Sequence, residues 1–156
     1  MFGWFKSLFS GPQQAGPPVE LRAFAVSDPT ISQDSITVEE DAWRVTGGDG
    51  SQTINLFEVE DPGVEKCQVT YRAKLKTENV EGKAYLEMWC RLPGKGEFFS
   101  KGLHNAVEGT NDWASYEIPF YLKQGQQPDL LKLDLTVEGS GSVWIKDVQV
   151  FQTPLK

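Results

Sequence analysis

Residues 84–92 have the sequence Ala-Tyr-Leu-Glu-Met-Trp-Cys-Arg-Leu, in which two kinds of side chain alternate without exception. Successive side chains of a β-strand point to opposite faces, so this pattern predicts an extended strand with one face in a hydrophobic core. The face toward the core carries the small and apolar residues Ala84, Leu86, Met88, Cys90 and Leu92. The outward face carries two aromatic rings between charged groups, from Tyr85, Glu87, Trp89 and Arg91.

The composition is that of one folded domain. The chain has 156 residues, of which 39% are hydrophobic and 24% charged, which is enough for a core and unlike a disordered chain. The net charge of −7 disfavours nucleic-acid binding, because an acidic protein repels the phosphate backbone. Five Trp, four Tyr and nine Phe favour β-structure.

Strand-like segments recur along the chain, and only the N-terminus has a helical period. Residues 77–83 and 102–111 are expected to be loops, and Pro119 favours an edge position or a bulge for its strand. The pattern predicts an all-β fold, an antiparallel jelly-roll β-sandwich of about eight or nine strands. The further strands are expected at residues 19–26, 35–38, 42–46, 53–59, 67–76, 113–122, 131–138 and 143–151, with a short apolar patch at 97–100.

The first ten residues form an aromatic arm, followed by a Gly- and Pro-rich linker at residues 11–18. On a helical wheel the apolar residues of the arm share one side, which predicts a short amphipathic helix. The arm is too short to span a bilayer, and Lys6 makes it a poor signal peptide. Three alternatives for the arm stay open from the sequence. The arm would pack on its own domain, dock on a partner or a membrane surface, or stay disordered. The docking residues would be Phe2, Trp4, Phe5, Leu8 and Phe9.

The two cysteines, Cys67 and Cys90, both lie on the inward side of their predicted strands. We interpret them as small buried hydrophobic residues, with a disulfide as the alternative. No CxxC motif or cluster of His and Cys indicates zinc.

Two segments in the C-terminal half carry a family resemblance. Residues 109–120, Gly-Thr-Asn-Asp-Trp-Ala-Ser-Tyr-Glu-Ile-Pro-Phe, and residues 139–148, Gly-Ser-Gly-Ser-Val-Trp-Ile-Lys-Asp-Val, resemble two strands of galactose-binding-like β-sandwich domains. Residues 71–76 resemble an earlier strand of the same domains, which include many carbohydrate-binding modules. The resemblance implies a galactose-binding-like domain over residues 19–156, preceded by an arm and linker over residues 1–18. It also implies that Trp113 and Trp144 pack in or beside the core; Trp43 is not assigned.

The resemblance also implies a site for a structural calcium ion. Many relatives have two acidic residues before the final valine of the last strand, whereas this chain has Lys146 and Asp147. Asp147 would be the metal ligand, and Glu39, Glu40 or Asp41 would have to supply further oxygens, since calcium takes six to eight. No other cofactor is expected.

Catalytic motifs are missing from the sequence. There is no GxSxG or HExxH motif, and the one histidine, His104, lies in a predicted loop. Glu87 with Asp134 or Glu117 would have the residue types of a glycosidase pair, but carboxylates on outward strand faces are usually only solvated. We therefore predict a protein that is not an enzyme.

The outward face of residues 84–92 is the best candidate binding site. Sugars have apolar C–H faces and hydroxyl rims, so they bind to aromatic rings flanked by hydrogen-bonding groups. Tyr85 and Trp89 would be the rings, and Glu87 and Arg91 the polar groups. Arg72 or Lys132 would add a further group from a neighbouring strand. The sequence thus predicts a non-catalytic carbohydrate-binding module.

Two alternatives stay open at this stage. Residues 95–111 or the N-terminal arm would fold over Tyr85 and Trp89 and make both rings structural. Alternatively, the protein would be an interaction domain that binds a protein or a membrane surface through the arm.

Overall fold

The structure is a computed structural model that describes residues 13–156. The predicted amphipathic helix of the arm, with its proposed membrane or partner contacts, lies outside the described residues. Those contacts were predicted at Phe2, Trp4, Phe5, Leu8 and Phe9. No helix among the described residues is long and apolar enough to cross a membrane.

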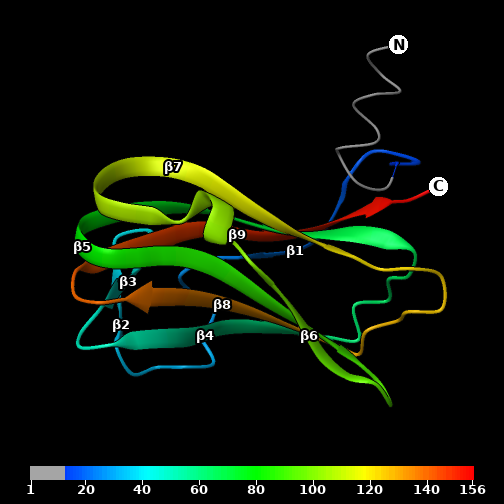
Figure 1. Cartoon of the computed structure of the whole chain (residues 1–156), viewed down its shortest axis with the longest axis horizontal. Coiled ribbons are helices and arrows are strands. Elements are labelled where there is room, and N and C mark those ends of the chain that lie inside the picture. Colours follow the sequence, from blue (N-terminus) through cyan, green and yellow to red (C-terminus); the bar gives the residue numbers. More distant parts are fainter. Residues whose placement is uncertain (1–12) are drawn as a thin grey trace, which may run out of the picture.

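The described chain is all-β, as predicted, and its strands form one curled antiparallel sheet (Figure 1). The one helical element within residues 13–156 is a single 3-10 turn, η1 (Leu103–Asn105). The strands are β1 (Val19–Phe24), β2 (Ile36–Glu39), β3 (Ala42–Thr46), β4 (Ser51–Glu60), β5 (Cys67–Leu92), β6 (Gly96–Lys101), β7 (Val107–Tyr121), β8 (Leu130–Glu138) and β9 (Ser142–Pro154).

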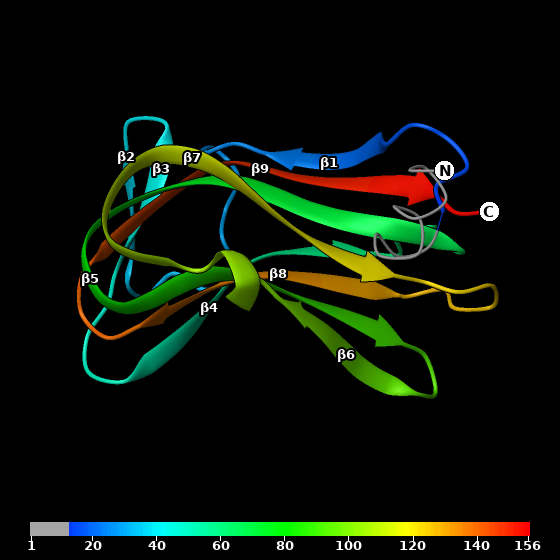
Figure 2. The same cartoon turned by 45° about the horizontal axis from the view of Figure 1, so that its top comes forward.

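The long strand β5 joins the two layers of the sandwich. Its first half pairs with β9 and β7, and its second half pairs with β8 and β6. The predicted loop at residues 77–83 is wrong: the strand continues through this segment, with register shifts on the β7 side and a left-handed residue, Asn79 (φ 54°). Figure 2 shows β5 curving back at this end of the molecule. The bend therefore places the two halves of one strand in different layers.

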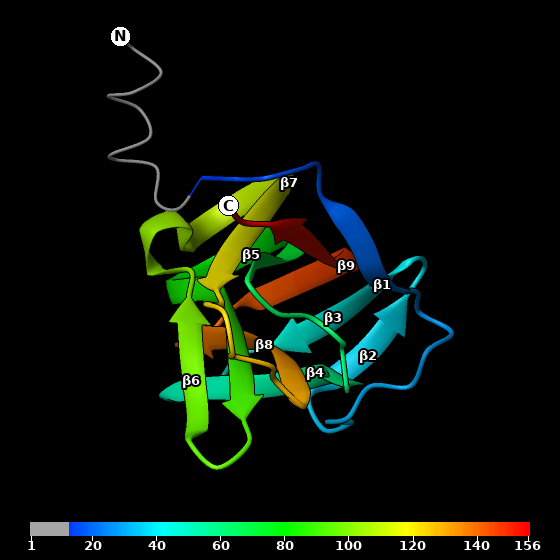
Figure 3. The same ribbon diagram turned by 90° about the vertical axis from the view of Figure 1, so that its right-hand side faces the viewer.

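We name the two layers after their central strands. The β9 layer contains β1, β2, β3, β9, the first half of β5, and β7, whereas the β8 layer contains β4, β8, the second half of β5, and β6 (Figure 3). β7 begins at Val107, so the predicted loop at 102–111 is too long. Among the described strands β7 pairs only with β5, which makes it an edge strand as Pro119 predicts.

The core lies between the inner faces of the layers and follows the predicted alternation. The inward residues of the strand segments at 67–75 and 84–92 are all buried, and so are those of β8. Trp43 is also in the core, 1% exposed, with its ring 5.2 Å from that of Phe57. Trp113 and Trp144, expected in or beside the core, are both half-buried, and neither is among the buried core residues. Trp144 lies between the fully buried Val143 and Ile145, so strand alternation turns it outward.

The two cysteines are free thiols buried in the core, which confirms the interpretation as small hydrophobic residues. Burial raises the pKa of Cys67 to about 11 and that of Cys90 to about 12, the latter helped by the charge of Cys67. Since the thiolate is the reactive form, we expect both to react negligibly with a disulfide reagent at pH 8 in the native protein. Both should react quickly in denaturant. Fast reaction of either thiol before unfolding would contradict this prediction.

The linker and the C-terminus lie together. Gln14 forms a β-bridge with Leu155, and the backbone N–H of Ala15 donates to the carbonyl of Pro154 at 2.7 Å. The end of the predicted linker is therefore paired with the sheet, next to the last strand.

Candidate functional site

The predicted binding residues lie on the solvent side of the β8 layer, which we call the β8 outer face. Its strands lie in the order β4, β8, β5, β6, and strand register places their outward side chains in rows. One row runs from Asn55 through Asp134 and Glu87 to Lys101. The next row runs from Glu58 through Lys132 and Trp89 to Phe99. The face thus combines a polar row with an aromatic one.

Two aromatic rings stand next to each other on this face. Trp89 is half-buried, and its ring centroid is 5.2 Å from that of Phe99 at an interplanar angle of 50°. Phe99 is 54% exposed, and the ammonium of Lys101 lies 4.8 Å from its ring centroid. The exposed aromatic surface therefore belongs to Trp89 and Phe99.

Tyr85, the other predicted platform, is only 6% exposed. Its hydroxyl donates to Glu138 Oε2 at 3.4 Å. Burial, with the charges of Glu138 and Glu87, raises the pKa of this phenol. Tyr85 therefore supports the face rather than presenting its ring to a ligand.

Glu87 is the next outward residue to Trp89 on β5, and it accepts a hydrogen bond from the indole. The carboxylate is 4% exposed and accepts a hydrogen bond of 2.6 Å from Trp89 Nε1. It also accepts one of 3.2 Å from the hydroxyl of Thr136, and Lys101 Nζ is 3.9 Å away. Glu87 is thus an acceptor that fixes the indole orientation.

Asp134 lies directly opposite Glu87 on β8 and is 5% exposed. Its Oδ1 is buried, and no hydrogen-bond partner for it exists within residues 13–156; the same is true of Asn55 Oδ1 on β4. Burial, and next the charge of Glu87, raises the pKa of Asp134 to about 7. The centre of the face therefore contains an unusual carboxyl group, which titrates near neutral pH.

Ion pairs form the rim of the face. Arg91 binds Asp129 through two hydrogen bonds of 2.8 and 3.3 Å, and the guanidinium holds the pKa of Asp129 below its usual range. Lys132 pairs with Glu97 at 2.8 Å, reaching from β8 across β5 to β6. These pairs flank Trp89 with fixed charged groups.

Arg72 does not join this face, although it was predicted as a site residue. It lies on the first half of β5, on the solvent side of the β9 layer. There it pairs with Glu117 at 3.1 Å and lies 4.5 Å from the ring centroid of Phe151. The bend in β5 separates Arg72 from Trp89, and nothing in the alternation of either half signals that bend.

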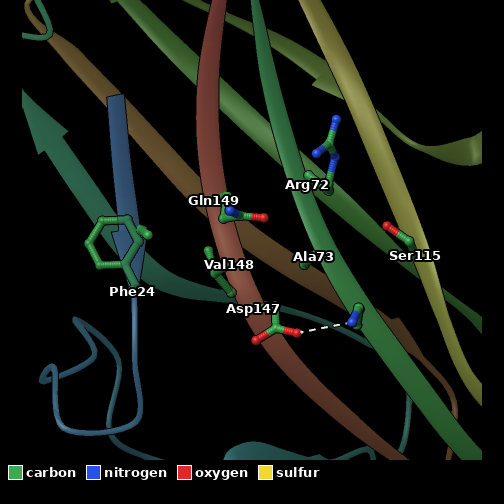
Figure 4. Close-up of a pocket in the computed structure, with 9 residues that line it drawn as sticks. Phe24, Arg72, Ala73, Ser115, Asp147, Val148 and Gln149 are labelled. Carbon is green, nitrogen blue, oxygen red and sulfur yellow. Dashed lines mark ion pairs between the residues drawn. The ribbon is translucent and has the colours of Figure 1, made fainter. Parts of the chain in front are cut away.

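A hollow of about 320 Å³ opens beside Arg72 on the β9 layer (Figure 4). Phe24 and Val148 contribute apolar atoms to its lining, and Ser115 lies at its β7 side. Its charged and amide groups have partners: Lys74 pairs with Asp147 at 3.3 Å, and Gln149 donates to Glu20 at 2.8 Å. The aromatic ring of the hollow, Phe24, is only 7% exposed, so the hollow lacks the exposed aromatic surface that Phe99 gives the β8 outer face.

Asp147, the predicted calcium ligand, has a left-handed backbone (φ 53°) and is bound to Lys74. Of the other candidate ligands, Asp41 pairs with Lys146 at 3.6 Å and Glu39 pairs with Arg44 at 3.0 Å. Residues 13–156 hold no group of three or more His, Cys, Asp or Glu side chains suited to a metal ion.

The two outward tryptophans of the β9 layer are covered by cations of the same chain. Trp144 has Arg44 at 5.1 Å and Lys76 at 5.3 Å from its ring, and Lys146 lies 4.3 Å from the ring of Trp113. His104 is exposed on η1.

The sequence analysis missed Phe99 and Asn55 as members of the β8 outer face. The apolar patch at 97–100 was the available signal for Phe99.

Neither the family models nor the curated protein sequences include a match to this chain. Solved structures match its fold. The CBM22-1 xylan-binding domain of Xyn10C from Paenibacillus barcinonensis has a TM-score of 0.59 at 13% identity, over 91% of this chain and 99% of that domain. The family 30 carbohydrate-binding module of a cellulosomal cellulase from Clostridium thermocellum has a TM-score of 0.50 at 13% identity, over 86% and 96% of the two chains.

A cyclase from Fischerella sp. TAU also matches, with a TM-score of 0.52 at 12% identity, over 83% of this chain and 74% of the cyclase. At these identities the likeness concerns the fold alone. The protein therefore has a β-sandwich fold like that of carbohydrate-binding modules, as its sequence motifs predict.

Proposed function

We propose that the protein is a non-catalytic carbohydrate-binding module and that the β8 outer face is its binding site. The observation that carries this proposal is the pair Trp89 and Phe99, which stand 5.2 Å apart on an outward strand face. Phe99 is 54% exposed, and no described cation other than Lys101 lies over either ring. Large exposed aromatic surface on a folded domain is typical of a binding site.

The surroundings of the two rings suit a polyhydroxylated ligand. A sugar ring packs its C–H face on an aromatic ring while its hydroxyls bind side chains at the edge. Arg91, Lys101 and Lys132 supply donors beside the rings, and Glu97 and Asp129 supply acceptors. Because several matched folds belong to carbohydrate-binding modules, one of them xylan-binding, xylan is the first ligand to test.

The carboxyl groups of the face argue against hydrolysis. A glycosidase needs two carboxyls that reach opposite sides of the scissile bond. Glu87 and Asp134 are 4% and 5% exposed, beneath the surface of the face, and Glu87 is already bonded to Trp89 and Thr136. Their place suits support of the aromatic residues better than contact with a glycosidic oxygen.

Trp89→Ala should lower the affinity for the bound glycan roughly 70-fold. Covering about 100 Å² of sugar at about 25 cal/mol per Å² corresponds to about 2.5 kcal/mol, which the truncation removes. Affinity electrophoresis and calorimetry with xylan, a β-glucan and a mannan would measure the change.

The matched control is Trp144→Ala, which removes an indole from the outer side of the other layer. It should leave glycan affinity unchanged. The proposal fails if the wild-type protein binds none of the glycans on an array. It also fails if the Trp144 variant loses glycan binding while the Trp89 variant keeps it.

A further inference from the structure

Glu87 and Asp134 occupy facing positions on neighbouring strands in the middle of the β8 outer face. Facing residues on antiparallel strands have Cβ atoms about 5 Å apart, so two carboxyl groups on one side are within reach of each other. Both side chains are nearly fully buried. Two ionised carboxylates in such a site repel each other strongly, and a shared proton relieves that repulsion.

The hydrogen bonds around the pair are unequal. Glu87 accepts hydrogen bonds from Trp89 Nε1 and the Thr136 hydroxyl, as expected of a carboxylate. Asp134 Oδ1 receives no donor from residues 13–156 although it is buried. A buried ionised oxygen without a donor is costly, whereas a protonated Asp134 would itself donate toward Glu87.

The neighbouring cations offset the effects of burial and of Glu87 on Asp134 only in part. Lys132, next on the same strand face, lowers the pKa of Asp134, but it is bound to Glu97 of β6 at 2.8 Å, and the charge of Glu97 raises that pKa. Lys101 of β6 is 3.9 Å from Glu87, on the side away from β8. From β4, Asn55 is uncharged, and Glu58 adds a further negative charge that raises the pKa of Asp134.

We propose that Asp134 and Glu87 share one proton and act together as a positioning pair for Trp89, so that carbohydrate binding weakens as the pH rises through neutrality. This inference rests on the proposed carbohydrate-binding function for its effect on affinity. The proton lies between the two carboxyl groups and leaves to solvent at higher pH.

The hydrogen bond that the Trp89 indole N–H donates to Glu87 couples the carboxyl pair to the aromatic ring. The pKa of Asp134, raised to about 7, agrees with loss of the shared proton near neutral pH. Once both groups are charged, repulsion displaces Glu87 from Asp134. Trp89 Nε1 is 2.6 Å from Glu87 Oε2, so the indole moves with the carboxylate and loses its alignment beside Phe99.

The first test needs no ligand. The indole N–H signal of Trp89 in a ¹H–¹⁵N spectrum, assigned by its loss in Trp89→Phe, should shift with pH with a midpoint near 7. Asp134→Asn should hold the signal at its low-pH position, because the amide donates to Glu87 at every pH. Asp147→Asn, the same change in the other layer, should titrate like the wild type.

The second test measures glycan affinity between about pH 5.5 and pH 8.5. The wild-type dissociation constant should rise roughly tenfold across this range, whereas that of Asp134→Asn should stay constant at the low-pH value. Glu87→Gln, a second variant in case Asp134→Asn folds poorly, should also lose the transition.

Two outcomes would overturn the inference: a Trp89 indole signal that does not titrate in the wild type, or an unchanged titration in Asp134→Asn. Absence of glycan binding at every pH would instead contradict the proposed function. The indole titration would still decide whether the pair shares a proton, so the two failures can be told apart.

Discussion

The protein should become easier to unfold as the pH rises from 5 to 8, and Asp134→Asn should remove most of that loss. Burial, followed by the charge of Glu87, raises the pKa of Asp134 from 3.8 to about 7 in the folded state. Between these values the folded state holds a proton that the unfolded state has released, so stability falls as the pH rises. At 1.36 kcal/mol per pKa unit, the part of this shift that lies between pH 5 and the folded-state pKa of about 7 corresponds to a loss of about 3 kcal/mol between pH 5 and pH 8.

Urea unfolding of both proteins at pH 5 and pH 8 measures this prediction. Carboxyl groups with lowered pKa, such as Glu65 and Asp129, change charge below this range and stabilise the fold above it, so they do not mask the effect. Asp147→Asn is the control for an Asp→Asn change on an ion-paired surface carboxylate, and it should keep the wild-type slope. A wild-type stability that is flat or increases between pH 5 and 8 would contradict the assigned pKa.

The second large effect is expected at the turn between β8 and β9, where Gly141→Ala should destabilise the protein by about 3 kcal/mol. Gly141 has φ +123°, a backbone conformation that L-residues rarely adopt. A Cβ at this position would lie 2.6 Å from both the carbonyl oxygen of Asn79 and the Cα of Val80. These contacts are with backbone at the bend of β5, so they cannot be relieved by rotating a side chain.

The matched control is Gly94→Ala in the turn between β5 and β6. Gly94 also has a positive φ, +76°, but a Cβ there would have no atom within 4 Å. This substitution should cost only about 1 kcal/mol, the penalty of the backbone conformation alone. Thermal unfolding of the two variants separates the effects, and equal losses would show that the close approach of Gly141 to β5 is unimportant.

Much of the fold was predictable because period-two alternation is local. The inward residues of 84–92 and 67–75 are buried as predicted, and so are the four alternating residues of β8, Leu131, Leu133, Leu135 and Val137. Turn residues such as Pro93 and Gly94 predicted the ends of strands to within a few residues. The family motifs at 109–120 and 139–148 also indicated the correct β-sandwich fold.

The bend at residues 77–83 was not predictable, because its backbone groups stay paired through a curving strand instead of a loop. That bend sends Arg72 to one layer and Trp89 to the other. Trp144 was expected in or beside the core because of its motif, although its position between Val143 and Ile145 in an alternating strand already indicated an outward side chain. Phe99 was missed because its four-residue patch alone does not reveal which strand it pairs with.

The amino-acid sequence by itself determined most of the strands, the inward faces of 67–75, 84–92 and β8, and the outward side of Tyr85, Glu87, Trp89 and Arg91. These features follow from local alternation, because successive side chains of a strand point to opposite faces. Only the tertiary structure decided which outward side chains meet: Phe99 beside Trp89, and Asp134 opposite Glu87. Strand pairing brings together residues far apart in the chain, and the resulting burial, absent from any single strand, gives Asp134 a pKa near neutrality.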